Sequence, residues 1–342
     1  MNKEDIPIFN LSKTELIPED KEVVRAEANR AIENETEEMK RVLREISIPM
    51  NERVSMVADE LHAFQTERCK SYGRNPPDKP EVFGVPIEYR ARLSKSDSIG
   101  GFTNSIDNTV VVFTYPNELD MWIAKKIAHE LEHAYAYHQN RADVNFEASE
   151  DDPQVIVGCY RRGGVTLSPK GEYGYFLEEG AAELGAIEYF TEHISKLFPD
   201  DYESYLKERS KFMEEQGLRE ATKDYLGPSY NRETQTVQMG ATIYAYPVGV
   251  VKSLIDELPE GRELINQAHI RGNYVPLARE FEKLLGKGTF RVFMSLPIKE
   301  ESIRGLGELF SAMNERERKT IMEKLLHSRP YDKETLRRRG VL

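Results

Sequence analysis

The segment His129-Glu130-Leu131-Glu132-His133 constrains the folding of this chain more than any other feature. In a helix, two histidines four residues apart lie on one face, one turn apart, so both imidazoles can reach one metal ion. Glu130 then projects beside the ion, where a carboxylate can accept a proton from an activated water. Apolar residues at helical spacing, uninterrupted by Gly or Pro, predict a helix over Ile123–His138. Asn117 or Asp120 is expected to cap it.

The residues that follow His133 exclude one way of completing a metal site. Proteins resembling metzincins need Gly three and His six residues after the second His, and here those positions hold Ala136 and Gln139. His138 is one residue early, which turns it about 100° around the helix. We therefore interpret His138 as a packing or solvent-facing residue rather than a ligand.

A second acidic segment supplies a candidate third ligand. Residues 176–183 read Phe-Leu-Glu-Glu-Gly-Ala-Ala-Glu. Residues 129–133 form a His-Glu-x-x-His (HExxH) motif. Because it follows that motif, the segment 176–183 resembles the second signature helix of gluzincins, the superfamily of thermolysin and aminopeptidase N. The resemblance implies that Glu179, which precedes Gly180, is the metal ligand. It also implies that Glu183, four residues later, holds a ligating His from behind. The small residues at 180–182 are expected to let this helix approach the HExxH helix closely.

Other glutamates compete for these roles. Glu178 has Ala182, not an acid, four residues later. Glu188 and Glu192 have the right spacing, but they lack small neighbours and are interpreted as surface charges. An amphipathic helix with solvated glutamates is the plain alternative for the whole segment.

The gluzincin resemblance extends over about residues 80 to 295 and implies a fold. We expect an α+β protein with a zincin-like catalytic domain, built from a small mixed β-sheet and the HExxH helix. A helical N-terminal region and a helical C-terminal half are expected to flank it. The predicted domains are a helical region at 1–78, the catalytic domain at 79–296, and a helical segment with a tail at 297–342.

The same resemblance implies the chemistry of a zinc metallopeptidase. Zn²⁺ is expected to be held by His129, His133 and Glu179, with one position open for water. The metal lowers the pKa of that water, and Glu130 removes its proton and later delivers it to the leaving amine. Since two imidazoles and a carboxylate suit several divalent ions, the identity of the metal is itself inferred.

A tyrosine beyond the ligands is the candidate for oxyanion stabilisation. In the aminopeptidase N branch, a Tyr followed three residues later by Gly opens a helix, and its hydroxyl donates to the developing negative charge. The segment from Tyr246 to Gly249 matches that spacing, and its Pro247 suits the first turn of a helix. Tyr244 and His269 are rivals for this role. For both tyrosines, packing in a core or interface is the alternative.

The residues before the HExxH helix predict a small sheet. Val82–Ala91 has strand character, and residues 99–104 and 109–113 read as a hairpin. An edge strand of such a sheet can pair with an extended peptide. Aminopeptidases of the superfamily carry a Gly-x-Met-Glu-Asn-like segment whose Glu binds the free amine. Here residues 100–104 are Gly-Gly-Phe-Thr-Asn, without a carboxylate. An endopeptidase is therefore preferred, with an aminopeptidase or a non-enzymatic zincin-fold binding or regulatory protein as alternatives.

Two charged, amphipathic helices are predicted before residue 75. Ile48-Pro49 is expected to end the first, and Asn51 is expected to cap the second. His62 and Cys69 lie on the second helix and are assigned to core or surface, since one His and one Cys do not make a zinc site. The region therefore shows no chemistry of its own.

The span of residues 140–175 is polar and rich in turn-forming residues, and we expect an irregular functional loop that roofs a cleft. Arg161 and Arg162 in this span can bind a substrate carboxylate, although solvated surface charge is the simpler interpretation. Beyond Phe198-Pro199 the pattern is again mostly helical.

Composition excludes several classes of function. The net charge of −12 argues against a general nucleic-acid surface. No apolar run reaches the roughly 18 residues that cross a bilayer, and no secretory signal is visible. Two cysteines give no disulfide framework. We expect a cytoplasmic protein with a peptide or protein substrate, without nucleic-acid or membrane partners; the oligomeric state stays open.

Overall fold

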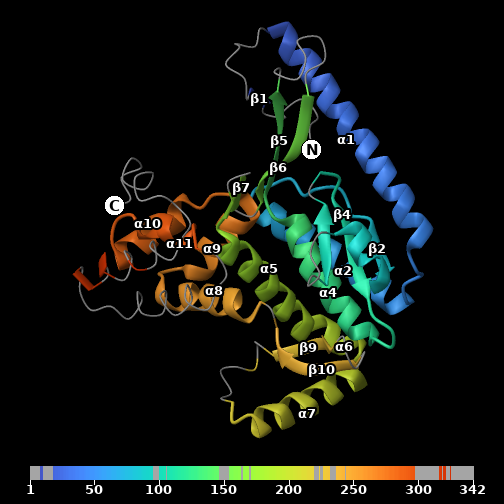
Figure 1. The fold of residues 1–342 in the computed structure, drawn as a ribbon. Helices are drawn as coiled ribbons and strands as arrows, with labels where there is room; N and C mark the ends of the chain where they lie inside the picture. The colour runs from blue at the N-terminus through green and yellow to red at the C-terminus, as the bar shows by residue number, and fades with distance from the viewer. Residues whose placement is uncertain are drawn as a thin grey trace. The chain divides into compact units, whose positions relative to one another are not determined.

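The structure, a computed structural model, describes most of the chain. The described residues are 8–10, 18–94, 100–104, 106–145, 154–162, 165–168, 171–218, 223, 226–231, 236–242, 244–296, 316–317, 319–320 and 324. They show a mixed α/β protein that is mostly helical and contains small sheets, as the sequence predicts (Figure 1).

The chain forms two compact units. The first unit comprises Met1–Arg162 and Tyr189–Pro199, and the second comprises Gly163–Glu188 and Asp200–Leu342. Each unit is described by itself below. The domain limits predicted near residues 78 and 296 stay a prediction.

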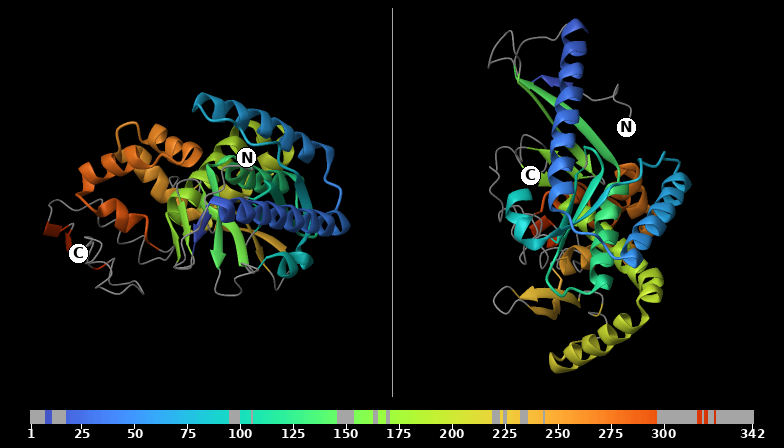
Figure 2. Two further views of the ribbon diagram at one scale, coloured as in Figure 1. Left: turned by 90° about the horizontal axis from the view of Figure 1, so that it is seen from above. Right: turned by 90° about the vertical axis from the view of Figure 1, so that its right-hand side faces the viewer.

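Two helices lie before residue 75 in the first unit, as expected. Helix α1 (Pro18–Ile46) ends just before Ile48-Pro49, and Figure 2 shows it as one unbroken helix. Helix α2 (Glu52–Ser71) is capped by Asn51, whose side-chain oxygen accepts a hydrogen bond from the backbone N–H of Arg53 at 2.9 Å. The backbone N–H of Ile48 donates to the carbonyl of Gly84 at 2.9 Å, which ties the connection between the helices to the first sheet.

A three-stranded sheet follows, in the order β2-β4-β3. Strand β2 (Val82–Pro86) runs parallel to β4 (Thr109–Thr114), and β3 (Gly101–Asn104) pairs antiparallel with β4. The predicted hairpin is therefore confirmed. The strand predicted over Val82–Ala91 is shorter, because Pro86 has no N–H to continue the ladder and the chain turns into a 3₁₀ helix at Ile87–Tyr89.

Helix α4 (Asp120–Tyr135) carries the HExxH segment and packs against α2, β3 and β4. The capping prediction was wrong: Leu119 is the N-cap, and no side chain caps the helix. Asn117 instead adopts a left-handed conformation, with φ of 60°, in the preceding turn. The helix also ends earlier than predicted, because Ala136 is extended, and His138 begins the next strand.

The span expected to be an irregular loop is largely β-structure, which corrects the sequence prediction. In the first unit, β5 (His138–Asn145) pairs antiparallel with β6 (Gln154–Arg162) and parallel with β1 (Ile8–Asn10), and α1 contacts both long strands (Figure 1). In the second unit, β7 (Val165–Ser168) pairs antiparallel with β8 (Gly171–Tyr173). The polar composition of these segments did not indicate strands. Their backbone hydrogen bonds are made by pairing with neighbouring strands, and this pairing does not require apolar side chains.

The second unit is mostly helical. Its core joins apolar residues of α5 (Tyr175–Tyr189) to those of four later helices. These are α8 (Ala245–Glu257), α9 (Gly261–Arg271), α10 (Val275–Leu285) and α11 (Thr289–Phe293). The last residue of α5 belongs to the first unit, where the helix continues as a π-helical turn at Phe190–Ile194 and α6 (Ser195–Leu197).

The short helix α3 (Arg90–Leu93) follows the 3₁₀ helix of the first unit. Further described elements lie between α6 and α8. Helix α7 (Pro199–Glu215) precedes a hairpin of β9 (Leu226–Asn231) and β10 (Thr236–Ala241), which the sequence did not predict. The helical segment with a tail predicted at 297–342 falls almost wholly outside the described residues. Within the described part of the chain, no helix combines the length and apolar character needed to cross a membrane.

Candidate metal centre

His129 and His133 converge on the buried side of α4. The two residues are 5% and 3% exposed, and their Nε2 atoms lie 3.1 Å apart. The rings meet edge to face, with centroids separated by 4.7 Å and planes inclined by 85°. The four-residue spacing on a helix therefore directs two imidazole nitrogens at a single point, as the sequence predicts.

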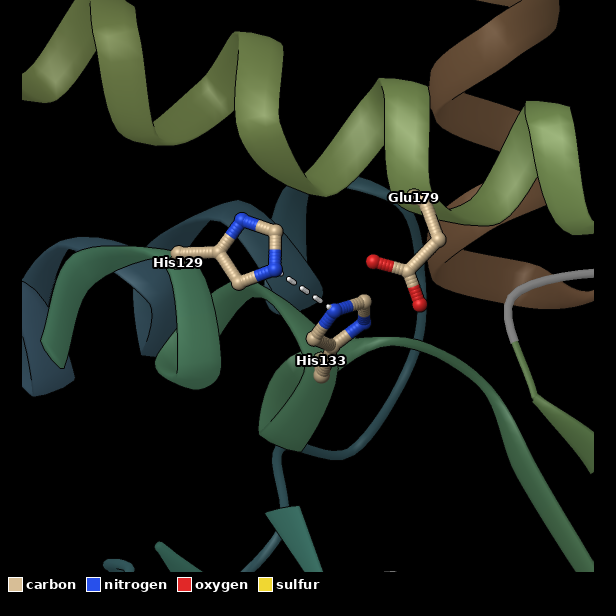
Figure 3. A group of neighbouring side chains, drawn as sticks. All are labelled: His129, His133 and Glu179. Atoms are coloured by element: carbon tan, nitrogen blue, oxygen red, sulfur yellow. Dashed lines mark hydrogen bonds between the residues drawn. The ribbon is translucent and has the colours of Figure 1, made fainter. Parts of the chain in front are cut away.

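Glu179 of α5 completes the cluster. One ligand atom from each of Glu179, His129 and His133 lies within 4.8 Å of the others, and all three residues are buried. Figure 3 shows the carboxylate of Glu179 directed towards the two imidazoles. Two imidazoles and a carboxylate are a donor set that divalent transition metals accept. This buried His-His-Glu cluster can hold a metal ion.

Glu130 lies on the same helix and faces strand β3. It is 5% exposed, and the hydroxyl of Thr103 lies 3.1 Å from its Oε2 and 2.7 Å from its backbone carbonyl. Gly101, on the same strand, leaves room for this side chain: a Cβ there would lie 3.1 Å from Cγ and Oε1 of Glu130 and 2.6 Å from the carbonyl of Val111. The sequence analysis did not identify Thr103 or Gly101 as site residues. It noted only that they lie in a predicted hairpin strand without a carboxylate.

Lys126 is a third residue that the sequence prediction missed. Its Nζ donates to Glu118 Oε2 at 2.7 Å and to the backbone carbonyl of Phe113 at the end of β4. Burial lowers the pKa of Lys126, and Glu118 opposes that shift. The contact anchors α4 to β4 one turn before Glu130. An acid eight residues before a lysine was the only signal in the sequence.

Gly180, next to Glu179, lies against the start of α8. A Cβ at Gly180 would collide with the backbone carbonyl of Pro247 and lie 2.6 Å from Cγ2 of Val251. The missing side chain therefore allows α5 to pack closely on the first turn of α8 within the second unit. The close approach of this helix to the HExxH helix, expected from residues 180–182, stays a prediction.

The other glutamates of α5 and its continuation separate into buried and exposed groups. Glu183 is 2% exposed and lies one turn after Glu179, and its predicted role behind an imidazole stays a prediction. Glu178 is fully buried but is not a member of the metal cluster. Glu188 forms an ion pair with Arg262 at 2.5 Å, with both side chains about half exposed, and the Glu192 side chain is 73% exposed. Their interpretation as surface charges is confirmed.

The three oxyanion candidates lie in the second unit. The match with the Tyr-opened helix places Tyr246 at the cap of that helix, but in the structure the cap is Tyr244 and the backbone of Tyr246 lies within the first turn of α8. The side chain of Tyr246 falls outside the described structure. Tyr244 is the N-cap of α8 and packs against the apolar core, and His269 of α9 is 1% exposed. None of the described side chains among them belongs to the metal cluster.

The remaining candidates lie on β5 and β6. His138 is partly buried at the start of β5, in agreement with a packing role. Arg161 and Arg162 end β6, and their side chains are outside the described structure.

No family model matches the chain, and no curated protein or solved structure is significantly similar to it. The fold and the site therefore define the protein only as a mixed α/β protein with a buried His-His-Glu cluster that can bind a metal ion.

Proposed function

We propose that this protein is a gluzincin-like zinc metallopeptidase that hydrolyses internal peptide bonds of peptides or proteins. One observation carries the proposal: His129, His133 and Glu179 form a buried donor cluster, and the next residue of the same helix, Glu130, is a buried carboxylate. Metal-assisted hydrolysis requires at least a set of metal ligands and a nearby group that can act as a general base.

The donor set fits zinc. Two histidines and a glutamate form the protein ligand set of several catalytic zinc sites, which leave a fourth position for water or substrate. Bound Zn²⁺ supplies a Lewis acid that lowers the pKa of a water and polarises a carbonyl. His129 and His133 would bind through Nε2, the atoms that already face each other at 3.1 Å.

Glu130 is proposed as the general base and acid. It takes the proton from the attacking water and later delivers it to the leaving amine. The hydroxyl of Thr103 beside Oε2 limits the rotation of this carboxylate. Tyr246 is proposed as the donor to the oxyanion, supported by its position in the first turn of α8, whose Pro247 packs against the residue after Glu179.

Strand β3 is proposed as the substrate-binding edge. Among the strands that the structure describes, β3 pairs only with β4, so its other edge offers N–H and C=O groups to an extended peptide. Its Thr103 contacts Glu130, which brings that edge to the proposed general base. The lack of a carboxylate in residues 100–104 favours an endopeptidase over an aminopeptidase. From the composition of the sequence we also propose a cytoplasmic location.

The proposal is tested by metal analysis combined with cleavage-site profiling on a proteome-derived peptide library. We expect one zinc per chain and cleavage within peptides whether their N-termini are free or blocked. Cleavage restricted to free N-termini would instead indicate the aminopeptidase alternative. A zinc-loaded protein that cleaves nothing in the library would favour a non-enzymatic binding or regulatory protein.

A further inference from the structure

Helix α2 presents two different surfaces to α4 within the first unit. Its first half contributes fully buried apolar residues, namely Val54, Val57 and Leu61. Its second half contributes polar residues, of which Gln65 and Cys69 are each only 1% exposed. The polar half contacts Glu132, which lies between the two histidines of the metal cluster in sequence. The helix that seemed to have no chemistry therefore touches the metal-binding helix through polar groups.

Glu132 is held by two side chains of α2. Its Oε1 accepts a hydrogen bond from Nε2 of Gln65 at 2.6 Å, and Nη1 of Arg68 lies 2.8 Å from Oε2 and 3.1 Å from Oε1. The Glu132 side chain is 2% exposed and that of Arg68 is 19% exposed. A carboxylate buried to this degree costs several kcal/mol in lost hydration unless it is paired. Glu132 is thus fixed by partners with directional hydrogen bonds.

The last turn of α4 is tied to the same region. The carbonyl of Tyr135 accepts a hydrogen bond from Nη1 of Arg74 at 2.5 Å and from Sγ of Cys69 at 3.8 Å. The Tyr135 hydroxyl is hydrogen-bonded to Nδ1 of His62 on α2. Carbonyls in the last turn of a helix lack partners within the helix, and a cation there is favourable. Side chains from α2 and the loop after it therefore cap the end of the metal-binding helix.

We propose that Arg68 and Gln65 are positioning residues for the metal centre, acting through Glu132. By fixing the rotation of α4 about its axis, they fix the direction in which His129 and His133 present their Nε2 atoms. An atom about 6 Å from a helix axis moves by roughly 2 Å when the helix rotates by about 20°. Metal–ligand distances tolerate only about 0.2 Å. Small rotations of α4 therefore separate a binding cluster from a non-binding one.

This inference rests on the proposed metal site, and it must be distinguished from a purely structural role of the ion pair. A buried ion pair is often replaceable by apolar residues of similar volume without loss of stability. The double variant Arg68→Met/Glu132→Leu makes that replacement. If the ion pair serves stability alone, the double variant recovers both the thermal midpoint and the metal affinity. If it positions α4, the midpoint recovers and the affinity does not.

The experiment measures two quantities on the full chain. One is the thermal midpoint of the metal-free protein, and the other is the dissociation constant for Zn²⁺ in competition with a chromogenic chelator. We expect the double variant to have a midpoint higher than that of Arg68→Met alone, which leaves Glu132 buried without its ion pair. We expect it to bind Zn²⁺ about 10–100-fold more weakly than the wild type, the scale of loss when residues that orient metal ligands are changed. The control is Lys70→Met, which breaks an exposed pair with Glu67 on the same helix and is expected to change neither quantity.

Three results would overturn the inference. The first is a double variant whose Zn²⁺ affinity lies within twofold of the wild type, which makes the network structural only. The second, decisive if the double variant does not fold, is an unchanged affinity in Gln65→Met, which removes one partner of Glu132 and keeps the ion pair. The third is a wild-type protein that does not bind Zn²⁺; this result alone also removes the proposed function.

Discussion

The hydroxyl of Thr103 lies 3.1 Å from Oε2 of Glu130 and 2.7 Å from the backbone carbonyl of the same residue. One side chain of an edge strand thus contacts both the main chain of the metal-binding helix and the carboxylate proposed as general base. This relationship links the strand proposed to bind substrate to the residue proposed to move the proton.

The substitution Thr103→Val should therefore lower turnover without removing metal. A valine fills the same volume but cannot donate a hydrogen bond, so the Glu130 carboxylate is less restrained. We expect kcat to fall about 10-fold, the scale of losses at partners of site residues, while zinc content is unchanged. Steady-state kinetics on one peptide and metal analysis measure both quantities. The matched control is Thr114→Val, a buried threonine on β4 whose hydroxyl lies 3.4 Å from the Val85 carbonyl. Equal kinetics for the two variants would contradict the role of Thr103.

Removal of the third ligand should abolish metal binding selectively. We expect Glu179→Gln to lose zinc, because a neutral amide is a far weaker ligand than a carboxylate. Titration calorimetry with Zn²⁺ measures this loss. Glu188→Gln, on the exposed side of the same helix, is the control and should bind zinc like the wild type. Normal zinc binding by Glu179→Gln would remove this residue from the site.

The close packing of α5 on α8 predicts a stability effect at Gly180. A methyl group there would collide with the Pro247 carbonyl and approach Cγ2 of Val251 to 2.6 Å. We expect Gly180→Ala to lower the free energy of unfolding by about 1–3 kcal/mol, as overpacking does. Chemical denaturation measures the change. In the control, Gly100→Ala, the added Cβ would lie 3.2 Å from Cδ of Lys126 and would meet no backbone atom within 4 Å, so a much smaller loss is expected. A Gly180→Ala variant as stable as the wild type would contradict the close contact.

Tyr189 predicts an alkaline dependence of stability. Burial raises the pKa of Tyr189 from 10.0 to about 12, so the unfolded chain ionises first as the pH rises. The neutral phenol then contributes stability below pH 10 that is lost between pH 10 and about 12. We expect Tyr189→Phe to reduce this loss, as measured by thermal midpoints at pH 8, 10 and 11. Its hydroxyl has no hydrogen-bond partner among the described residues, so the variant should not be less stable at pH 8. Parallel pH curves for the two proteins would contradict the shifted pKa.

Local patterns predicted the elements that carry the cluster. The HExxH spacing, the hairpin before it and the glutamate-rich helix each depend on residues close in sequence, and periodicity is informative at that range. The convergence of Glu179 with the histidines could be expected only through a family resemblance, since no local pattern determines which of several glutamates lies near a distant helix.

Most of what the sequence did not predict depends on contacts between separate segments of the chain. Strands β5 and β6 were missed because ladder pairing between segments tolerates polar residues, and the periodicity of a single sequence does not show pairing. The contacts of Gln65 and Arg68 with Glu132 join residues more than sixty positions apart. On sequence alone these polar residues belonged to an amphipathic helix, and only the packing of α2 on α4 reveals their partner. The capping prediction at Asn117 failed for another reason. Asparagine is favoured both at helix N-caps and in turns, so the residue type alone does not distinguish the two positions.

The central claim is tested most directly by the turnover of zinc-loaded Glu130→Gln and wild-type protein on the same peptide. Glutamine preserves the size of the side chain and leaves the three proposed ligands intact, but it cannot accept the proton. We predict equal zinc content and a kcat at least about 100-fold lower in the variant, in keeping with the contribution of general acid–base catalysis. Equal turnover by the two zinc-loaded proteins, or no turnover by the wild type on any peptide of a diverse library, would contradict a zinc peptidase.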